Sequence, residues 1–162
     1  MLGDVVEAAS AVGLVRVVTD DPEAMDAVRA LDATVVADPG GGQGGAVAAG
    51  LNGQVGLCLV VNADLPCATP DALAGLAAQR PAFVSAADGT TNALALPTPA
   101  WFEPLYGPGS AARFTAAGLA DVSIPELGHD VDTLSDLLQL TFQVGPRTAL
   151  VLNQHKLGVE RV

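Results

Sequence analysis

Short apolar runs alternate with alanine-rich segments along this chain, and this alternation strongly limits how it can fold. Apolar and β-branched residues predict strands or extended segments at 14–20, 33–39, 55–64, 82–88, 92–97 and 121–127. Helices are predicted at 2–12, 21–31, 46–52, 69–79, 110–118 and 133–141, with Asp21, Thr69 and Thr133 as N-caps. Strands that alternate with helices are typical of an α/β fold with a mostly parallel sheet. Such sheets bind ligands at the carboxyl ends of their strands.

The composition limits both the size of the core and the class of partner. The chain has 162 residues, half of them apolar, which predicts one domain over residues 1–162. A net charge of −11 argues against nucleic acid and against an anionic membrane as partners. The apolar runs are far shorter than the ~20 residues that cross a bilayer, and the acidic start does not resemble a signal peptide. We therefore expect a cytoplasmic protein in which Cys58 and Cys67 are reduced.

Acidic residues lie at the ends of two predicted extended segments. Asp64 follows the apolar run in VVNADLP, at the expected carboxyl end of a strand. Asp130 and Asp132 lie two residues apart in HDVDT, on the same side of an extended segment. Each has a purely structural alternative, because Asp64 can cap a turn and Asp132 can cap the next helix. Two acidic strand ends in one domain suggest a site for a divalent cation, since Mg²⁺ prefers carboxylate oxygens.

Two further segments carry groups that can bind an anion. In DGTTNALALP, residues 88–97, two hydroxyls follow a glycine and can face an oxyanion, although a hairpin turn explains them equally well. In YGPGSAARF, residues 106–114, Ser110 is the predicted N-cap of a helix, whose free N–H groups attract anions. Arg113 can add a planar pair of donors for phosphate or carboxylate, and a capped surface helix is the alternative. The run GGGQGG at 40–45 matches neither the Walker A motif nor the dinucleotide-binding fingerprint.

Four motifs together resemble one family in order and spacing. They are NADLP at 62–66, GTTNAL at 89–94, FEPLYGPGSAARF at 102–114 and DVDT at 130–133. The family is the guanylyltransferases of coenzyme F-420 biosynthesis, and the likeness runs from about residue 2 to about residue 148. It implies a GT-A-like (Rossmann-like), three-layer nucleotidyltransferase. The implied reaction joins GMP from GTP to phosphoenolpyruvate or 2-phospho-L-lactate and releases pyrophosphate, and composition favours phosphoenolpyruvate.

The resemblance also implies roles for particular residues. Asp64, Asp130 and Asp132 would hold Mg²⁺, with Asp64 as the catalytic residue. The phosphorylated acid would be bound by Thr91, Gly107 and Ser110, to which the sequence adds Arg113 as a candidate. A metal suits the chemistry, because two like charges ~4 Å apart repel by about 4 kcal/mol at an effective dielectric near 20. A chain with one lysine and six arginines has few side chains to screen that repulsion.

Two departures from the family pattern carry expectations of their own. Gln43-Gly44 stands where members carry a leucine-asparagine pair, so recognition of guanine or ribose is expected to differ. Members begin with a strand and a basic loop for the triphosphate, and Met1 aligns inside the helix that follows. We therefore expect an N-terminally incomplete domain. The rival hypotheses are a molybdenum-cofactor-type guanylyltransferase, against which GPGS argues, and a non-catalytic protein that binds only the acid. A homodimer is a further prediction.

Overall fold

The computed structural model describes residues 1–154, and Lys156 lies outside them. The helices are α1 (Leu2–Ser10), α2 (Pro22–Arg29), α3 (Gly42–Leu51), α4 (Pro70–Ala78), α5 (Ser110–Ala116), α6 (Leu134–Gln139) and α7 (Pro146–Gln154), with the short 3₁₀ helices η1 (Pro99–Trp101) and η2 (Pro125–Leu127). The strands are β1 (Arg16–Val18), β2 (Thr34–Val36), β3 (Cys58–Val61), β4 (Ala82–Ser85), β5 (Thr91–Leu96) and β6 (Ala120–Asp121). The predicted order of helices and strands is confirmed.

Three helix starts follow from the side chains predicted to cap them. Asp21, Thr69 and Thr133 each accept a hydrogen bond from a backbone N–H in the first turn of the next helix. At α6 the cap is a capping box, in which Asp136 also accepts from the N–H of Thr133. The predictions were wrong for α3, which begins at Gly42 rather than at Ala46, and they missed α7 and η1.

Residues 42–45 of the glycine run belong to α3, and close packing requires glycine at two of these positions. A Cβ on Gly44 would lie 2.9 Å from Cβ of Pro104, and a Cβ on Gly45 would lie 2.5 Å from the carbonyl oxygen of Gly40. Larger side chains at these two positions would therefore force the helix away from its neighbours.

The strands form two separate sheets. β1 and β2 pair in parallel, and the larger sheet has the order β3-β5-β4-β6. β5 runs antiparallel to β3 and to β4, whereas β4 and β6 are parallel. Three of the four strands of the larger sheet therefore run in one direction, and β5 alone runs against them. The start of β5 consequently lies at the same edge of this sheet as the carboxyl ends of β3 and β4.

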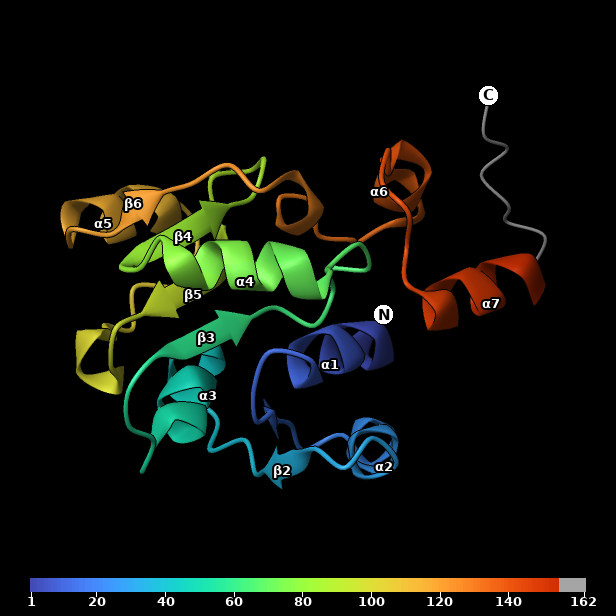
Figure 1. Cartoon of the computed structure of the whole chain (residues 1–162), viewed down its shortest axis with the longest axis horizontal. Helices are drawn as coiled ribbons and strands as arrows, with labels where there is room; N and C mark the ends of the chain where they lie inside the picture. Colours follow the sequence, from blue (N-terminus) through green and yellow to red (C-terminus); the bar gives the residue numbers. More distant parts are fainter. Residues whose placement is uncertain (155–162) are drawn as a thin grey trace.

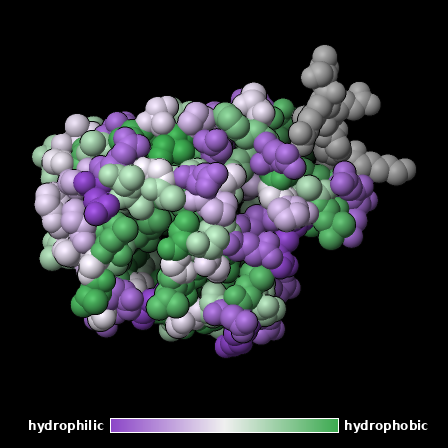
Figure 2. All heavy atoms as spheres, in the orientation of Figure 1, coloured by the Kyte–Doolittle hydropathy of each residue, from purple (hydrophilic) through white to green (hydrophobic). Residues whose placement is uncertain are grey.

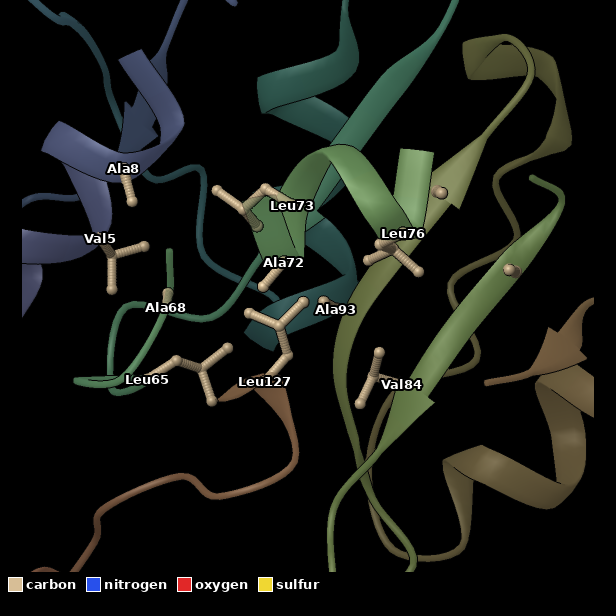
Figure 3. Close-up of a cluster of buried hydrophobic side chains, with 12 residues drawn as sticks. Val5, Ala8, Leu65, Ala68, Ala72, Leu73, Leu76, Val84, Ala93 and Leu127 are labelled. Carbon is tan, nitrogen blue, oxygen red and sulfur yellow. The ribbon is translucent and has the colours of Figure 1, made fainter. Parts of the chain in front are cut away.

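Two clusters of buried side chains cover the two faces of the larger sheet. One joins α1 and α4 to β4, β5 and η2, and its side chains converge in Figure 3. The other packs α5 against the opposite face, and Leu51 of α3 lies at its border. Phe83 and Phe114 are at its centre, with ring centroids 6.0 Å apart. The fold is therefore the expected three-layer arrangement of helices, sheet and helices.

β1 and β3 belong to different sheets and do not pair with each other. α3 packs on β1, where a Cβ on Gly50 would lie 3.1 Å from Val18, and its Leu51 borders the cluster that includes Val60 of β3. Every residue of β1 and of β3 is only partly buried. Figure 1 shows β2 and α2 set apart from the larger sheet. Figure 2 shows hydrophobic surface in the lower part of the molecule, below that sheet.

The last described helices lie at one end of the molecule. Figure 1 shows α6 and α7 at the end opposite β6 and α5. A buried carboxylate of α1 fixes α7, because Asp4 accepts hydrogen bonds from the N–H groups of Arg147 and Thr148 and from the Thr148 hydroxyl. Cys58 and Cys67 are free thiols, as predicted. Among the described residues, no helix combines the length and the apolar character needed to cross a membrane.

Candidate active site at the end of strand β3

Asp64 lies three residues beyond the end of β3, and a long-range hydrogen bond brings its expected partners to it. The N–H of Val131 donates to the carbonyl oxygen of Asp64 at 3.1 Å. This bond fixes the segment that carries Asp130 and Asp132 beside the end of the strand. Asp132 does not cap the next helix, because Thr133 caps α6. Among the described residues, Asp64 Oδ1 has no hydrogen bond to the turn that follows it.

The three predicted metal ligands lie together. One carboxylate oxygen from each of Asp64, Asp130 and Asp132 lies within 4.8 Å of the others. Asp64 and Asp130 are half-buried, and Asp132 is exposed. Burial raises the pKa of Asp64, and the charges of Asp130 and Asp132 raise it further, while a hydrogen bond from its own backbone opposes them. Holding three carboxylates this close costs free energy that a bound cation would recover.

The donor set fits a hard divalent cation. Three carboxylates supply the oxygen ligands that Mg²⁺ prefers, and they leave positions for water and substrate oxygens. Asp64 Oδ1 is buried and has no hydrogen-bond partner among the described residues. An unpaired buried acceptor costs about 1–3 kcal/mol, so this atom is suited to an electropositive ligand.

The two hydroxyls predicted to bind the acid lie in contact. Thr91 begins β5, Ser110 begins α5, and their side-chain oxygens are 2.9 Å apart with both residues almost fully buried. Ser110 was predicted as the N-cap, but Gly109, in the left-handed conformation, occupies that position. Ser110 is the first residue of the helix instead, and its hydroxyl bonds to Thr91 rather than to the backbone of its own helix.

Arg113 shapes the glycine loop through its backbone. Its guanidinium donates to the carbonyl oxygens of four successive residues, at distances of 2.8–3.2 Å: Leu105, Tyr106, Gly107 and Pro108. Arg113 was predicted to offer these N–H groups to the acid, but the loop carbonyls accept their hydrogen bonds instead. Gly107 has φ +104, a conformation that a side chain would strain. Arg113 thus holds the loop that presents Gly107 and Ser110.

Aromatic side chains pack against one another at the same loop. The ring of Tyr106 packs edge-on against Phe114, with centroids 5.4 Å apart, and also contacts Phe102 at 6.3 Å. Burial raises the pKa of Tyr106 well above its ordinary range, so its hydroxyl stays neutral. The loop before α5 therefore rests on a rigid base, which is what a preorganised binding loop needs.

An open cleft of about 610 Å³ adjoins Asp64. The residues that line it are Met1, Leu2, Gln43, Asn62, Ala63 and Asp64. Gln43 Nε2 donates to Asn62 Oδ1 at 2.8 Å, which ties the start of α3 to the end of β3. The sequence predictions gave no role to Asn62 or to Asn92, although both lie in the motifs that contain Asp64 and Thr91. Their position next to those residues was the signal that could have indicated them.

Comparison with known proteins identifies the class to which this fold belongs. The model of the MobA-like NTP transferase domain matches residues 1–147, and the chain therefore belongs to this family. A solved structure of a protein described as a nucleotide-diphospho-sugar transferase, from Desulfovibrio desulfuricans G20, has the same fold with a TM-score of 0.62 at 19% identity. The match covers 97% of this chain and 83% of that one.

Closer relatives narrow the class. The phosphoenolpyruvate guanylyltransferase of Streptomyces scabiei (strain 87.22) is 39% identical in an alignment 161 positions long, which covers 88% of this chain and 74% of the relative. That of Geodermatophilus obscurus is 40% identical in an alignment 164 positions long, which covers 94% of this chain and 76% of the relative. The chain belongs to the phosphoenolpyruvate guanylyltransferase family, and the predicted resemblance is confirmed.

Proposed function

We propose that this protein transfers GMP from GTP to phosphoenolpyruvate, with release of pyrophosphate, as a step of coenzyme F-420 biosynthesis. The observation that carries the proposal is that the carboxylate cluster of Asp64, Asp130 and Asp132 lies near a buried hydroxyl pair. The two are linked through β5, where Asn92 contacts Asp130 and the preceding residue, Thr91, belongs to the hydroxyl pair. A cation site next to an anion site is what the joining of two phosphates requires. Membership of the guanylyltransferase family supports the same reaction.

The proposed roles follow from the positions of the side chains. Asp64, Asp130 and Asp132 would hold Mg²⁺, which when bound neutralises charge on the phosphates. The hydroxyls of Thr91 and Ser110 bind the acid, because a pair bonded to each other still has one hydroxyl hydrogen to donate outward.

The glycine loop and the open cleft complete the proposed site. Gly107 contributes backbone to the acid site, and Arg113 keeps the loop in place. The cleft lined by Gln43 and Asn62 receives the nucleotide. Because Gln43 stands where the family pattern has leucine, we propose that its amide changes the way in which the base or ribose is held.

We also propose that the free edges of β1 and β3 accept one further strand, followed by a basic loop. β1 runs antiparallel to α3, since Arg16 donates to Gly50 and Asn52 at the carboxyl end of that helix. β3 also runs antiparallel to α3, since Gln43 at the start of that helix contacts Asn62 beyond the end of β3. A strand between them would therefore be parallel to both. It would end beside the carboxylates, where a triphosphate needs positive charge.

The activity test follows pyrophosphate release. The chain is incubated with GTP and Mg²⁺, and with phosphoenolpyruvate or 2-phospho-L-lactate in separate reactions. We expect acid-dependent release that is fastest with phosphoenolpyruvate and is abolished in Asp64→Asn, which keeps the size of the side chain. Release in the Asp64→Asn variant at the rate of the parent would contradict the role of Asp64.

Calorimetry separates this proposal from its two rivals. Titrations with phosphoenolpyruvate and with GTP, both with Mg²⁺, should each give heat of binding for a guanylyltransferase of this kind. Binding of the acid alone would indicate a non-catalytic protein, and binding of GTP without the acid would favour a molybdenum-cofactor-type enzyme. A homodimer and a cytoplasmic location stay predictions, and sedimentation equilibrium tests the first of them.

A further inference from the structure

Asn92 occupies an irregular position in β5. The pairing of β5 with β4 shifts here, because Val84 is opposite Ala93 while the next residue, Ser85, is opposite Thr91. Asn92 is the extra residue of this β-bulge. Bulges redirect a side chain and are frequent next to active sites.

The redirected side chain contacts one member of the carboxylate cluster. Leu94 and Leu96 belong to the core cluster against α5, and regular alternation would place residue 92 on that face as well. The amide of Asn92 instead contacts the carbonyl oxygen of Leu127 and the carboxylate of Asp130. Its side chain is almost completely buried, at 1% exposure.

Both N–H groups of this amide are used. Asn92 Nδ2 donates to Leu127 O at 3.1 Å and to Asp130 Oδ1 at 3.4 Å. The orientation of the amide is fixed by these partners, because both are oxygens that only accept and would repel the amide oxygen. Asn92 therefore connects the end of η2 to one of the three carboxylates.

The other end of the amide is unpaired. Asn92 Oδ1 is buried and has no hydrogen-bond partner among residues 1–154, a condition that Asp64 Oδ1 shares. Buried polar atoms without a partner are few in native proteins and point to a missing water or ion. Both unpaired atoms are acceptors, and both belong to residues that lie beside Asp130.

We propose that Asn92 is a positioning residue of the metal site. Its Nδ2 holds the Asp130 carboxylate toward Asp64 and Asp132, and its Oδ1 accepts a hydrogen bond from a water bound to the cation. This inference rests on the proposed function, which supplies the cation. Partners that orient metal ligands in this way typically contribute about 10–100-fold to metal affinity.

The test is a titration with Mn²⁺, whose free form is counted by electron paramagnetic resonance. We expect Asn92→Leu, which removes both donors and the acceptor, to weaken Mn²⁺ binding by about 10–100-fold. Leu76→Ala is the matched control, because Leu76 is buried in the same core cluster as Leu127 and forms no part of the carboxylate cluster. It should melt at a lower temperature and keep the affinity of the parent.

A double-mutant cycle shows whether Asn92 acts through Asp130. In an Asp130→Ala background, Asn92→Leu should cost clearly less Mn²⁺ affinity than in the parent, because only the contact of Oδ1 with the cation-bound water is then left to lose. The same loss in both backgrounds, or an unchanged affinity in the single variant, would overturn the inference. If Asn92→Leu does not fold, Asn92→Ser serves, since its shorter hydroxyl cannot make the three contacts. Absence of Mn²⁺ binding in the parent would instead contradict the metal site of the proposed function.

Discussion

The two halves of this molecule differ in how completely they are packed. In the half built on β4 and β5, all six residues of β5 and three of the four in β4 are buried. In the other half, residues 11–57, which the structure describes without a gap, Val28 alone is fully buried. The same kinds of apolar residue occur in both halves. The difference lies in pairing among the described strands, because β4 and β5 each have a partner strand on both edges, whereas β1 and β2 pair only with each other.

This difference shows where the proposed site obtains its rigidity. Thr91, Asn92 and Ser110 are buried in the packed half, and Asp130 is tied to that half through Asn92. The cleft beside Asp64 is lined in part by Gln43, which lies in the first turn of α3 in the less packed half. The side chains proposed to bind the acid and the metal are therefore held in place by packing, while the region proposed to receive the nucleotide is open.

The largest expected effect is on the stability of the packed half. Phe83→Ala removes a fully buried ring that contacts Phe114 and should lower the free energy of unfolding by about 3–5 kcal/mol. Val17→Ala in β1 is the matched change in the open half and should cost about 1 kcal/mol, because Val17 is only partly buried. Urea unfolding measures both. Equal losses would mean that the two halves do not differ in packing.

Sequence reasoning succeeded where a local signal exists. The helix caps Asp21, Thr69 and Thr133 were predicted because a short polar side chain before an apolar segment suffices to mark a helix start. The grouping of Asp64 with Asp130 was also predictable, since ligands gather at one edge of an α/β sheet and the family motifs coincide with these residues.

Features that depend on long-range contacts were missed. α7 is fixed by Asp4, which lies 144 residues before Thr148, so no nearby residue indicates its start. The N-cap position of Ser110 and the free donor pair of Arg113 were predicted from the helix start alone, whereas the Ser110 hydroxyl bonds to Thr91 and the Arg113 guanidinium to four loop carbonyls. The bulge at Asn92 results from pairing with β4 and has no signature within β5 itself.

An intermediate loss of stability is expected at the contact between α1 and α7. α1 directly precedes the open half in the sequence. Gly145→Ala would place a Cβ inside the carboxylate of Asp4, and we expect a loss of about 1–3 kcal/mol. Gly75→Ala is the matched control, because Gly75 lies exposed within α4 with open space around it. It should gain about 0.5–1 kcal/mol. Thermal unfolding followed by circular dichroism distinguishes them, and a destabilised Gly75→Ala or a neutral Gly145→Ala would contradict this packing.

The smallest expected effect is a change in thermal stability at Asp64, in the candidate site. Because burial and two neighbouring carboxylates raise the pKa of Asp64, the metal-free fold binds its proton more tightly than the unfolded chain does. Stability from this group is therefore lost as pH rises through the raised pKa. Asp64→Asn should melt a few degrees higher than the parent at neutral pH without metal, and the gain should shrink in acid. A lower melting temperature for Asp64→Asn would show that the ionised carboxylate stabilises the fold.

The proposed reaction itself is tested most directly by phosphorus NMR of a mixture of the chain, GTP, Mg²⁺ and phosphoenolpyruvate. Transfer of GMP should consume the GTP and phosphoenolpyruvate signals together and produce pyrophosphate and a new phosphoanhydride in equal amounts. Omission of the acid should leave GTP intact, as should Asp64→Asn. Unchanged GTP in the complete mixture, or pyrophosphate formed without the acid, would contradict the proposal that this site joins GMP to a phosphorylated acid.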